Sequence, residues 1–227
     1  MKIIPIIYEN DEIFIINKPS GVPVQGGEGI AHPLDRELPV QTGCKIYLVH
    51  RLDQDTAGLM VVAKTPESAA KWTKLIAGHE VRKEYDAVCI GKFKEKTGAI
   101  AENIVQHGGE RSAVTRYRVT AEGSVACADG SVLPVSLVHL VLETGRMHQI
   151  RIHLAKQGCP VAGDDQHGNF RQNKLLRKAA GVKRLMLAAV TLTVPLEGSV
   201  QTFTAPLPEH MQAFAGTYFG DMPAESR

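Results

Sequence analysis

The chain has 227 residues, of which 44% are hydrophobic and 22% are charged, and its net charge at pH 7 is +2. These values are typical of a soluble globular protein with one sizeable core or at most two small domains. The apolar runs of the sequence are too short for a membrane-spanning segment. The N-terminus lacks the pattern of a signal peptide.

The cysteines carry no metal or disulfide signature. Four are present, scattered along the chain without a Cys-x-x-Cys pair: Cys44, Cys89, Cys127 and Cys159. This spacing argues against a zinc site and against a disulfide framework. We therefore expect a protein of the reducing cytoplasm.

The N-terminal third is predicted to contain short strands around loops. Residues 24–44 show little periodicity, so we expect a long irregular loop there. Thr65 followed by Pro66 is typical of a helix start, and this helix is predicted to end before Gly78. Runs rich in β-branched residues predict strands at 3–8, 12–17, 46–49 and 59–63.

The rest of the chain is predicted to be richer in strands. Residues 146–157 have a helical pattern, 208–214 a short helical one, and 124–130 are expected to form a turn or insert. Because no regular alternation of strand and helix is present, the pattern favours an α+β fold with a mostly antiparallel sheet. Apolar alternation predicts strands at 81–91, 99–105, 112–120, 135–143, 184–194 and 200–204.

A polar loop between two predicted strands holds two basic residues and two carboxylates. Asp53 lies between Arg51 and a Thr-Ala-Gly turn, with Asp55 two residues further on. A carboxylate at such a strand edge can be presented to a cleft as an acid. The alternative is a surface turn with a local ion pair.

Two long motifs resemble the signatures of one enzyme family. The segment from His50 to Leu59, His-Arg-Leu-Asp-x-x-Thr-x-Gly-Leu, resembles a signature of the RNA pseudouridine synthases of the RluA type. The segment from Thr144 to His153 resembles that family's Gly-Arg-Thr-His-Gln-Ile-Arg-x-His. Shorter matches follow the family's order, at Asn17-Lys18-Pro19-x-Gly21, Lys83-Glu84-Tyr85 and Arg184-Leu185-Met186-Leu187.

The resemblance implies a fold and a reaction. The fold is the pseudouridine synthase catalytic fold, an α+β fold with a mixed, mostly antiparallel sheet, flanking helices and a central cleft. We expect residues 1–227 to form one catalytic domain without an S4-type RNA-binding domain, because the catalytic pattern begins by Tyr8. The reaction converts specific uridines of structured RNA, tRNA or rRNA, to pseudouridine. It adds no group, so no cofactor and no metal are expected; the expected assembly is a monomer.

The resemblance also assigns three catalytic residues. Asp53 matches the essential carboxylate, Arg151 its basic partner, and Tyr85 the tyrosine expected to stack on the target base. A neighbouring arginine keeps a carboxylate ionised despite burial. Whether Asp53 attacks the sugar, attacks the base or removes a sugar proton stays open. Taken alone, Arg151 could be a helix-surface residue and Tyr85 part of a core.

Further residues are candidates for binding RNA. The target uridine must leave the stacked helix, and Arg51 could fill the gap or bind a neighbouring phosphate. Leu187 would form an apolar wall of the base pocket or belong to the core, and Lys18 would contact phosphate or be exposed. Six cations without an acid form a solvated face or a phosphate-binding flank: Arg171, Lys174, Arg177, Lys178, Lys183 and Arg184.

Two other functions remain compatible with the residues. The first is a non-catalytic RNA-binding or RNA-folding protein, in which Asp53→Asn would have no phenotype. The second is a glycosidic-bond hydrolase that pairs Asp53 with Asp55 or Glu143 and releases free uracil. Four departures from the family pattern bear on the choice of substrate rather than on the reaction: Ala57, Met147, His167 and Ala188.

Overall fold

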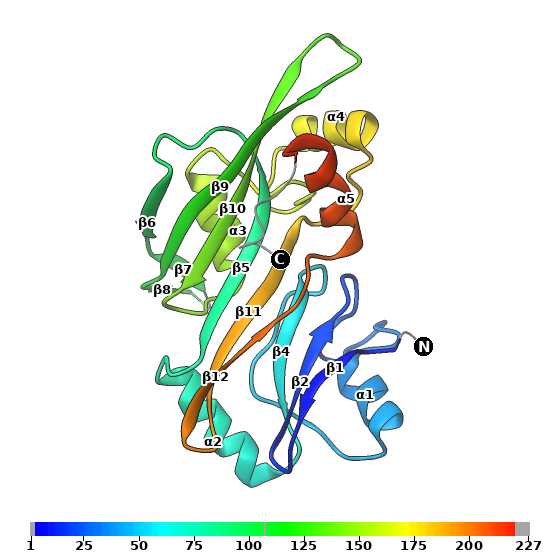
Figure 1. Ribbon diagram of the computed structural model, residues 1–227, viewed down its shortest axis with the longest axis vertical. Coiled ribbons are helices and arrows are strands. Elements are labelled where there is room, and N and C mark those ends of the chain that lie inside the picture. The colour runs from blue at the N-terminus through cyan, green and yellow to red at the C-terminus, as the bar shows by residue number, and fades with distance from the viewer. Residues whose placement is uncertain (1–2, 107, 221–227) are drawn as a thin grey trace. The chain divides into compact units, whose positions relative to one another are not determined.

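The computed structural model describes residues 3–106 and 108–220 (Figure 1). The chain divides into two compact units, the first made of Met1–Lys83 and Ala189–Ala205 and the second of Glu84–Ala188 and Pro206–Arg227. The described part contains twelve strands and five helices, which confirms the predicted α+β class. A single catalytic domain over residues 1–227 stays a prediction.

The first unit is built on antiparallel strands. Every residue of its strand β4 is buried, as expected for a strand covered on both faces. β11 begins in the second unit with Leu187 and Ala188 and continues in the first. The order is β1 (Ile6–Glu9), β2 (Ile13–Lys18), β4 (Ala57–Ala63) and β11 (Leu187–Leu196), with β3 (Tyr47–Leu48) paired to β4 and β12 (Ser199–Thr204) to β11.

Helix α2 (Pro66–Ala77) has the bounds that its capping residues predict. The Thr65 side chain accepts a hydrogen bond from the Ser68 N–H, and the Ser68 hydroxyl accepts one from the Thr65 N–H, which forms a capping box. The helix buries Trp72 completely in the core of this unit. Leu75 and Ile76 pack against the same core, so one face of the helix is apolar and covered.

The predicted irregular loop over 24–44 is wrong in its second half, which forms helix α1 (Leu34–Thr42). Leu34 and Leu38, four residues apart, are fully buried and hold the helix against the unit. Gly43 ends it in a left-handed conformation. The sequence does not predict this helix because Pro39 lies inside it. An internal proline removes one N–H donor and usually breaks a helix.

The second unit contains a second set of antiparallel strands. The β9–β10 hairpin is longer than predicted: Ala126 still pairs with Val132, so the expected turn over 124–130 forms later. Most of β5 lies in this unit. The order is β5 (Arg82–Ile90), β10 (Val132–Leu142), β9 (Val114–Ala126) and β6 (Thr97–Ala101), and a separate hairpin joins β7 (Ile104–Gln106) to β8 (Gly109–Arg111).

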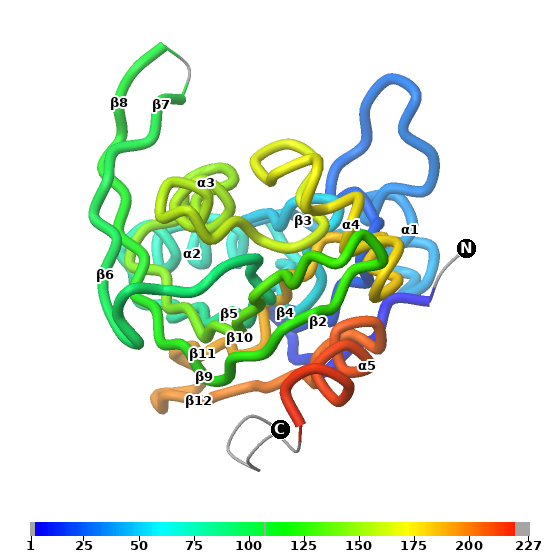
Figure 2. The backbone as a smooth tube through the Cα atoms, turned by 90° about the horizontal axis from the view of Figure 1, so that it is seen from above, coloured from blue at the N-terminus to red at the C-terminus, as the bar shows by residue number. Residues whose placement is uncertain are grey.

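Three helices belong to the second unit: α3 (Gln149–Lys156), α4 (Phe170–Ala180) and α5 (Glu209–Tyr218). α3 and α5 both contact β9, and they lie on opposite sides of it (Figure 2). α4 was not predicted as a helix, because only Asn173 and Leu176 are buried along it and no apolar stripe is visible in its sequence. Within residues 3–106 and 108–220, every helix is too short or too polar to span a membrane.

Candidate active site

The loop that carries Asp53 is fixed through its backbone. The Thr56 N–H donates to the Asp53 carbonyl over 3.2 Å, and the Gly21 N–H donates to the Gln54 carbonyl over 3.0 Å. The Ser20 hydroxyl donates to the carbonyl of Asp55 over 2.9 Å. The first bond closes the loop on itself, and the other two tie it to the turn that follows β2. The conformation of the Asp53 loop therefore depends on the short Asn-Lys-Pro-x-Gly match at residues 17–21.

The two carboxylates of this loop differ in their surroundings. Asp53 is half-buried, whereas Asp55 is exposed to solvent. A carboxylate that is partly shielded from water interacts more strongly with a bound substrate, because the local dielectric is lower. This difference favours Asp53 over Asp55 as the acting acid, in agreement with the motif match.

Lys18 does not have either of the predicted roles, and this part of the site prediction is wrong. Its side chain is completely buried, and its ammonium donates to the carbonyls of Pro19, Val22 and Gln54 over 3.2, 2.9 and 2.8 Å. The three N–H donors are used, so none is left for a phosphate. Burial lowers the pKa of Lys18 to about 7, opposed by the carboxylates of Asp55 and Asp53. Lys18 therefore stabilises the Asp53 loop through its hydrogen bond to the carbonyl of Gln54.

Gly58 lets the strand that leaves the loop pack closely. Its φ is +116°, and a Cβ on this residue would lie 2.1 Å from the carbonyl oxygen of Ala189. No other residue fits both the backbone conformation and the contact. The glycine of the Thr-x-Gly turn is thus required for β4 to lie beside β11.

His50 and Arg51 precede Asp53 and have different environments. The His50 Nε2 accepts a hydrogen bond from the Val61 N–H over 2.9 Å. Burial lowers the pKa of His50 to about 3, with a smaller contribution from Lys83, so the ring is neutral and supports the loop. Arg51 is exposed. Its position is compatible with the predicted contact to RNA, which stays a prediction.

Arg151 is held in the interior of the second unit. It is 7% exposed, so the alternative of a helix-surface residue is wrong. Its guanidinium makes a bidentate salt bridge with Asp164, Nε to Oδ2 and Nη2 to Oδ1, each over 2.8 Å. Burial opposes the charge on Asp164, but hydrogen bonds from Arg151, His167 and Gln166 outweigh it and lower the pKa of the carboxyl. The predicted pairing of Arg151 with Asp53 stays a prediction.

Asp164 is a site residue that sequence reasoning missed. Besides binding Arg151, its Oδ1 accepts hydrogen bonds from the N–H groups of Gln166 and His167, which shapes the turn after it. The only sequence signal is the pair Gly163-Asp164. Gly163 is needed there, because a Cβ would lie 2.1 Å from the Arg184 carbonyl oxygen.

The second signature folds as a loop that leads into α3. His148 has a positive φ of 53°, so the helix begins at Gln149 and not at Arg146 as predicted. The Gln149 side chain accepts from the Thr144 hydroxyl and the Arg146 N–H, both within 3.0 Å. The His148 Nδ1 lies 2.8 Å from the Nε2 of His167. These contacts fix the start of the helix that carries Arg151.

Tyr85 and Leu187 are both buried in the second unit, with exposed fractions of 6% and 3%. Tyr85 lies on β5, and Leu187 is the first residue of β11. Their burial agrees with a base-stacking tyrosine and an apolar pocket wall, and equally with core packing. Both roles stay predictions.

The basic segment forms the exposed face of α4 and the loop after it. Asn169 caps the helix by accepting from the Gln172 N–H. Phe170 is 81% exposed and lies next to the first cation. Within the described residues these cations form no salt bridge and all are exposed: Arg171, Lys174, Arg177, Lys178, Lys183 and Arg184. Throughout residues 3–106 and 108–220, no group of three His, Cys, Asp or Glu side chains could hold a metal ion.

Comparison with known proteins identifies the family. Residues 12–156 match the model of the RNA pseudouridylate synthases. An uncharacterized RNA pseudouridine synthase of Bacillus subtilis is 34% identical over 94% of this chain and 72% of that protein. The ribosomal large subunit pseudouridine synthase D of Nitrosomonas europaea is 36% identical over 92% of this chain and 63% of that protein. The chain thus spans about two thirds of the length of these relatives.

Solved structures agree on the fold. The human RNA pseudouridylate synthase domain containing 4 superposes with a TM-score of 0.74 at 24% identity, over 93% of this chain and 91% of that one. The human domain containing 1 protein gives 0.77 at 24% identity, over 96% and 88%. The fold is that of the pseudouridine synthases, as predicted. The chain belongs to the RNA pseudouridine synthase family, and its substrate is RNA.

Proposed function

We propose that this chain isomerises uridine to pseudouridine in ribosomal RNA, with Asp53 as the essential carboxylate. The observation that supports it most directly is the half-buried Asp53 in a loop fixed by Lys18 and by three backbone contacts. Such a loop holds the carboxylate in one place before RNA binds, and preorganisation of this kind lowers the barrier of the chemical step.

The choice of ribosomal RNA rests on the relatives. Proteins named ribosomal large subunit pseudouridine synthase D or C are 36% and 32% identical to this chain, in Nitrosomonas europaea and Escherichia coli respectively. Transfer RNA is the competing substrate pool.

The four cysteines are free, which agrees with action in a reducing cytoplasm.

The reaction is balanced without an added group. The N1–C1′ bond of uridine breaks, the base turns, and a C5–C1′ bond forms. The hydrogen at C5 leaves as a proton and N1 gains one, so the product is an isomer and no electron acceptor is consumed. Asp53 acts at the sugar–base junction, Arg151 supplies positive charge, and Tyr85 stacks on the base. The base must first be turned out of the helix, which costs a few kcal/mol.

The exposed cations of α4 support RNA binding. Phosphate contacts provide most of the sequence-independent affinity for nucleic acid. Arg171, Lys174 and Lys178 are exposed along α4, and Phe170 adds an exposed aromatic face beside them. Bases of single-stranded RNA stack on such rings. We propose that this face binds the backbone of the substrate near the target site.

The proposal is tested by nucleoside analysis of rRNA and tRNA that lack pseudouridine, after incubation with the protein. Wild-type protein should form pseudouridine in rRNA, and Asp53→Asn should form none while binding RNA with an unchanged Kd. Asp55→Asn is the matched control, and it should retain most activity because Asp55 is exposed. Free uracil in the digest would instead support a hydrolase. RNA binding without product in either pool would support the non-catalytic alternative.

A further inference from the structure

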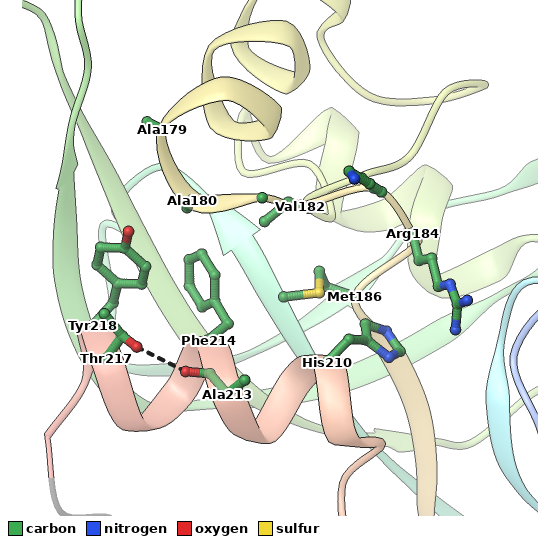
Figure 3. Close-up of a pocket in the computed structure, with 12 residues that line it drawn as sticks. Ala179, Ala180, Val182, Arg184, Met186, His210, Ala213, Phe214, Thr217 and Tyr218 are labelled. Atoms are coloured by element: carbon green, nitrogen blue, oxygen red, sulfur yellow. Dashed lines mark hydrogen bonds between the residues drawn. The ribbon is translucent and has the colours of Figure 1, made fainter.

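A pocket of about 510 Å³ lies in the second unit, between the end of α4 and one face of α5 (Figure 3). Its apolar surface comes from Val182, Met186 and Phe214. Small residues keep it open on both walls, Ala179 at the end of α4 and Ala213 on α5. The volume is within the range of ligand-binding pockets, about 300–1,000 Å³. Apart from Lys183 and Arg184, which belong to the candidate phosphate-binding flank, the residues of this pocket have no role assigned above.

The charged side chains that line the pocket are basic. Among the residues that the structure describes, no aspartate or glutamate lines the pocket, whereas Lys183 and Arg184 do, together with His210. Lys183 and Arg184 are exposed and form no salt bridge with a described residue. The preceding turn of α4 adds Arg177 and Lys178, which are also exposed. An occupant that combines a flat apolar part with a negative charge fits this distribution, because it satisfies both the apolar surface and the cations.

Two hydroxyl groups, those of Thr217 and Tyr218, line the pocket beside its apolar surface. The Thr217 hydroxyl donates to the Ala213 carbonyl over 2.9 Å, which leaves its oxygen able to accept. The Tyr218 hydroxyl points toward the end of α4 in Figure 3. Phe214 points into the same space from the middle of α5 (Figure 3). Apolar faces with a few polar edge groups are what a nucleobase presents.

We propose that this pocket holds an extrahelical nucleobase of the RNA substrate, at a nucleotide other than the target uridine. Lys183 and Arg184 bind the phosphates that flank it. The inference rests on the proposed function, because it takes RNA as the substrate. It adds a second base-recognition site, which would select RNAs that carry an unpaired nucleotide at a fixed distance from the target.

The first test fills the pocket. Ala213→Phe adds a ring at an exposed lining position, so the core is not overpacked. Its Kd for an rRNA fragment should rise about tenfold, since stacking is worth about 1–3 kcal/mol per base, while kcat at saturating RNA should not change. Gln212→Phe adds the same ring at the neighbouring residue, which does not line the pocket, and should leave the Kd unchanged. Should Ala213→Phe prove unstable, Ala179→Phe fills the pocket from the opposite wall.

The second test uses RNA with single abasic nucleotides. One non-target position should weaken binding to wild-type protein about tenfold and have no further effect on Ala213→Phe. Equal Kd values for wild type and Ala213→Phe, or an abasic effect that persists in the variant, would overturn the proposal. The readout is binding, so it is independent of turnover. Failure of wild-type protein to form pseudouridine would overturn the proposed function and not the pocket assignment.

Discussion

Arg151 and Asp164 form a bidentate salt bridge in the interior of the second unit, with both N–O distances at 2.8 Å. Asp164 is 2% exposed, so the pair is shielded from water. Two parallel hydrogen bonds fix the plane of the guanidinium as well as its charge. Asp164 therefore acts as a positioning residue for Arg151, and substitutions at Asp164 should affect both stability and activity.

Asp164→Asn should lower the free energy of unfolding by about 3–5 kcal/mol, because it leaves the buried Arg151 charge without its partner. The neighbouring Asp165 is exposed, so Asp165→Asn is the matched control and should change the value by no more than about 0.5 kcal/mol. Urea denaturation monitored by circular dichroism measures both. Equal stability of the two variants would show that the salt bridge contributes nothing.

Lys18→Met should destabilise the loop that carries Asp53. The change keeps the length of the side chain and removes the donor to three carbonyls, of Pro19, Val22 and Gln54. The expected loss is about 3 kcal/mol, about 1 for each carbonyl left without a donor. Lys74 is exposed on α2, and Lys74→Met should have almost no effect. A thermal unfolding midpoint for Lys18→Met close to that of the control would contradict the assigned role.

His139 should make stability depend on pH. Its Nδ1 and Nε2 lie 2.8 Å from carboxylate oxygens of Asp86 and Glu84, respectively. The hydrogen bond with Asp86 is the main cause that raises the pKa of His139, and burial opposes it. A raised pKa in the folded state gives stability that is complete below the ordinary value of about 6.5. That stability is lost as the pH rises through the folded-state pKa.

His139→Gln should therefore be less stable than wild type at about pH 5.5 by roughly 1.5–3 kcal/mol, the range for a hydrogen bond with a charged group. The difference should shrink above the folded-state pKa of His139. Urea unfolding at a series of pH values measures it. Parallel curves for the two proteins over this range would mean that the imidazolium is not stabilised by Asp86 and Glu84.

Lys174→Gln combined with Lys178→Gln should weaken RNA binding and flatten its salt dependence. Each phosphate contact contributes roughly 0.7–0.9 to the slope of log K against log salt, so the slope should fall by about 1.5. Lys92 and Lys94 are exposed and lie outside α4, and the same change there should leave the slope unaltered. Identical slopes for the two double variants would remove α4 from the RNA-binding surface.

Local signals in the sequence predicted local structure well. The Thr65-Pro66 pair gave the start of α2, because capping is a short-range interaction between neighbours. Helix α4 was missed, since its face is a row of cations and only two of its residues, Asn173 and Leu176, are buried. α1 was missed because Pro39 lies inside it. Helices held by a few tertiary contacts leave a weak periodic signal.

The candidate site was predictable as far as the motifs reach. They selected Asp53 and Arg151, and the structure adds what surrounds them. Lys18 binds backbone carbonyls, which have no signature in the sequence, so its burial could not be read from the motif. Asp164 lies thirteen residues after Arg151, and only the fold brings the two together.

The most direct test of the role of Asp53 is release of tritium from rRNA labelled at C5 of uridine, with wild-type protein and with Asp53→Asn. Joining C5 to C1′ must expel the C5 hydrogen, so release reports the reaction itself. Wild-type protein should release tritium from rRNA and little or none from tRNA, and Asp53→Asn should lose the release while RNA binding is retained. Release by Asp53→Asn near the wild-type rate would contradict the central role of this carboxylate.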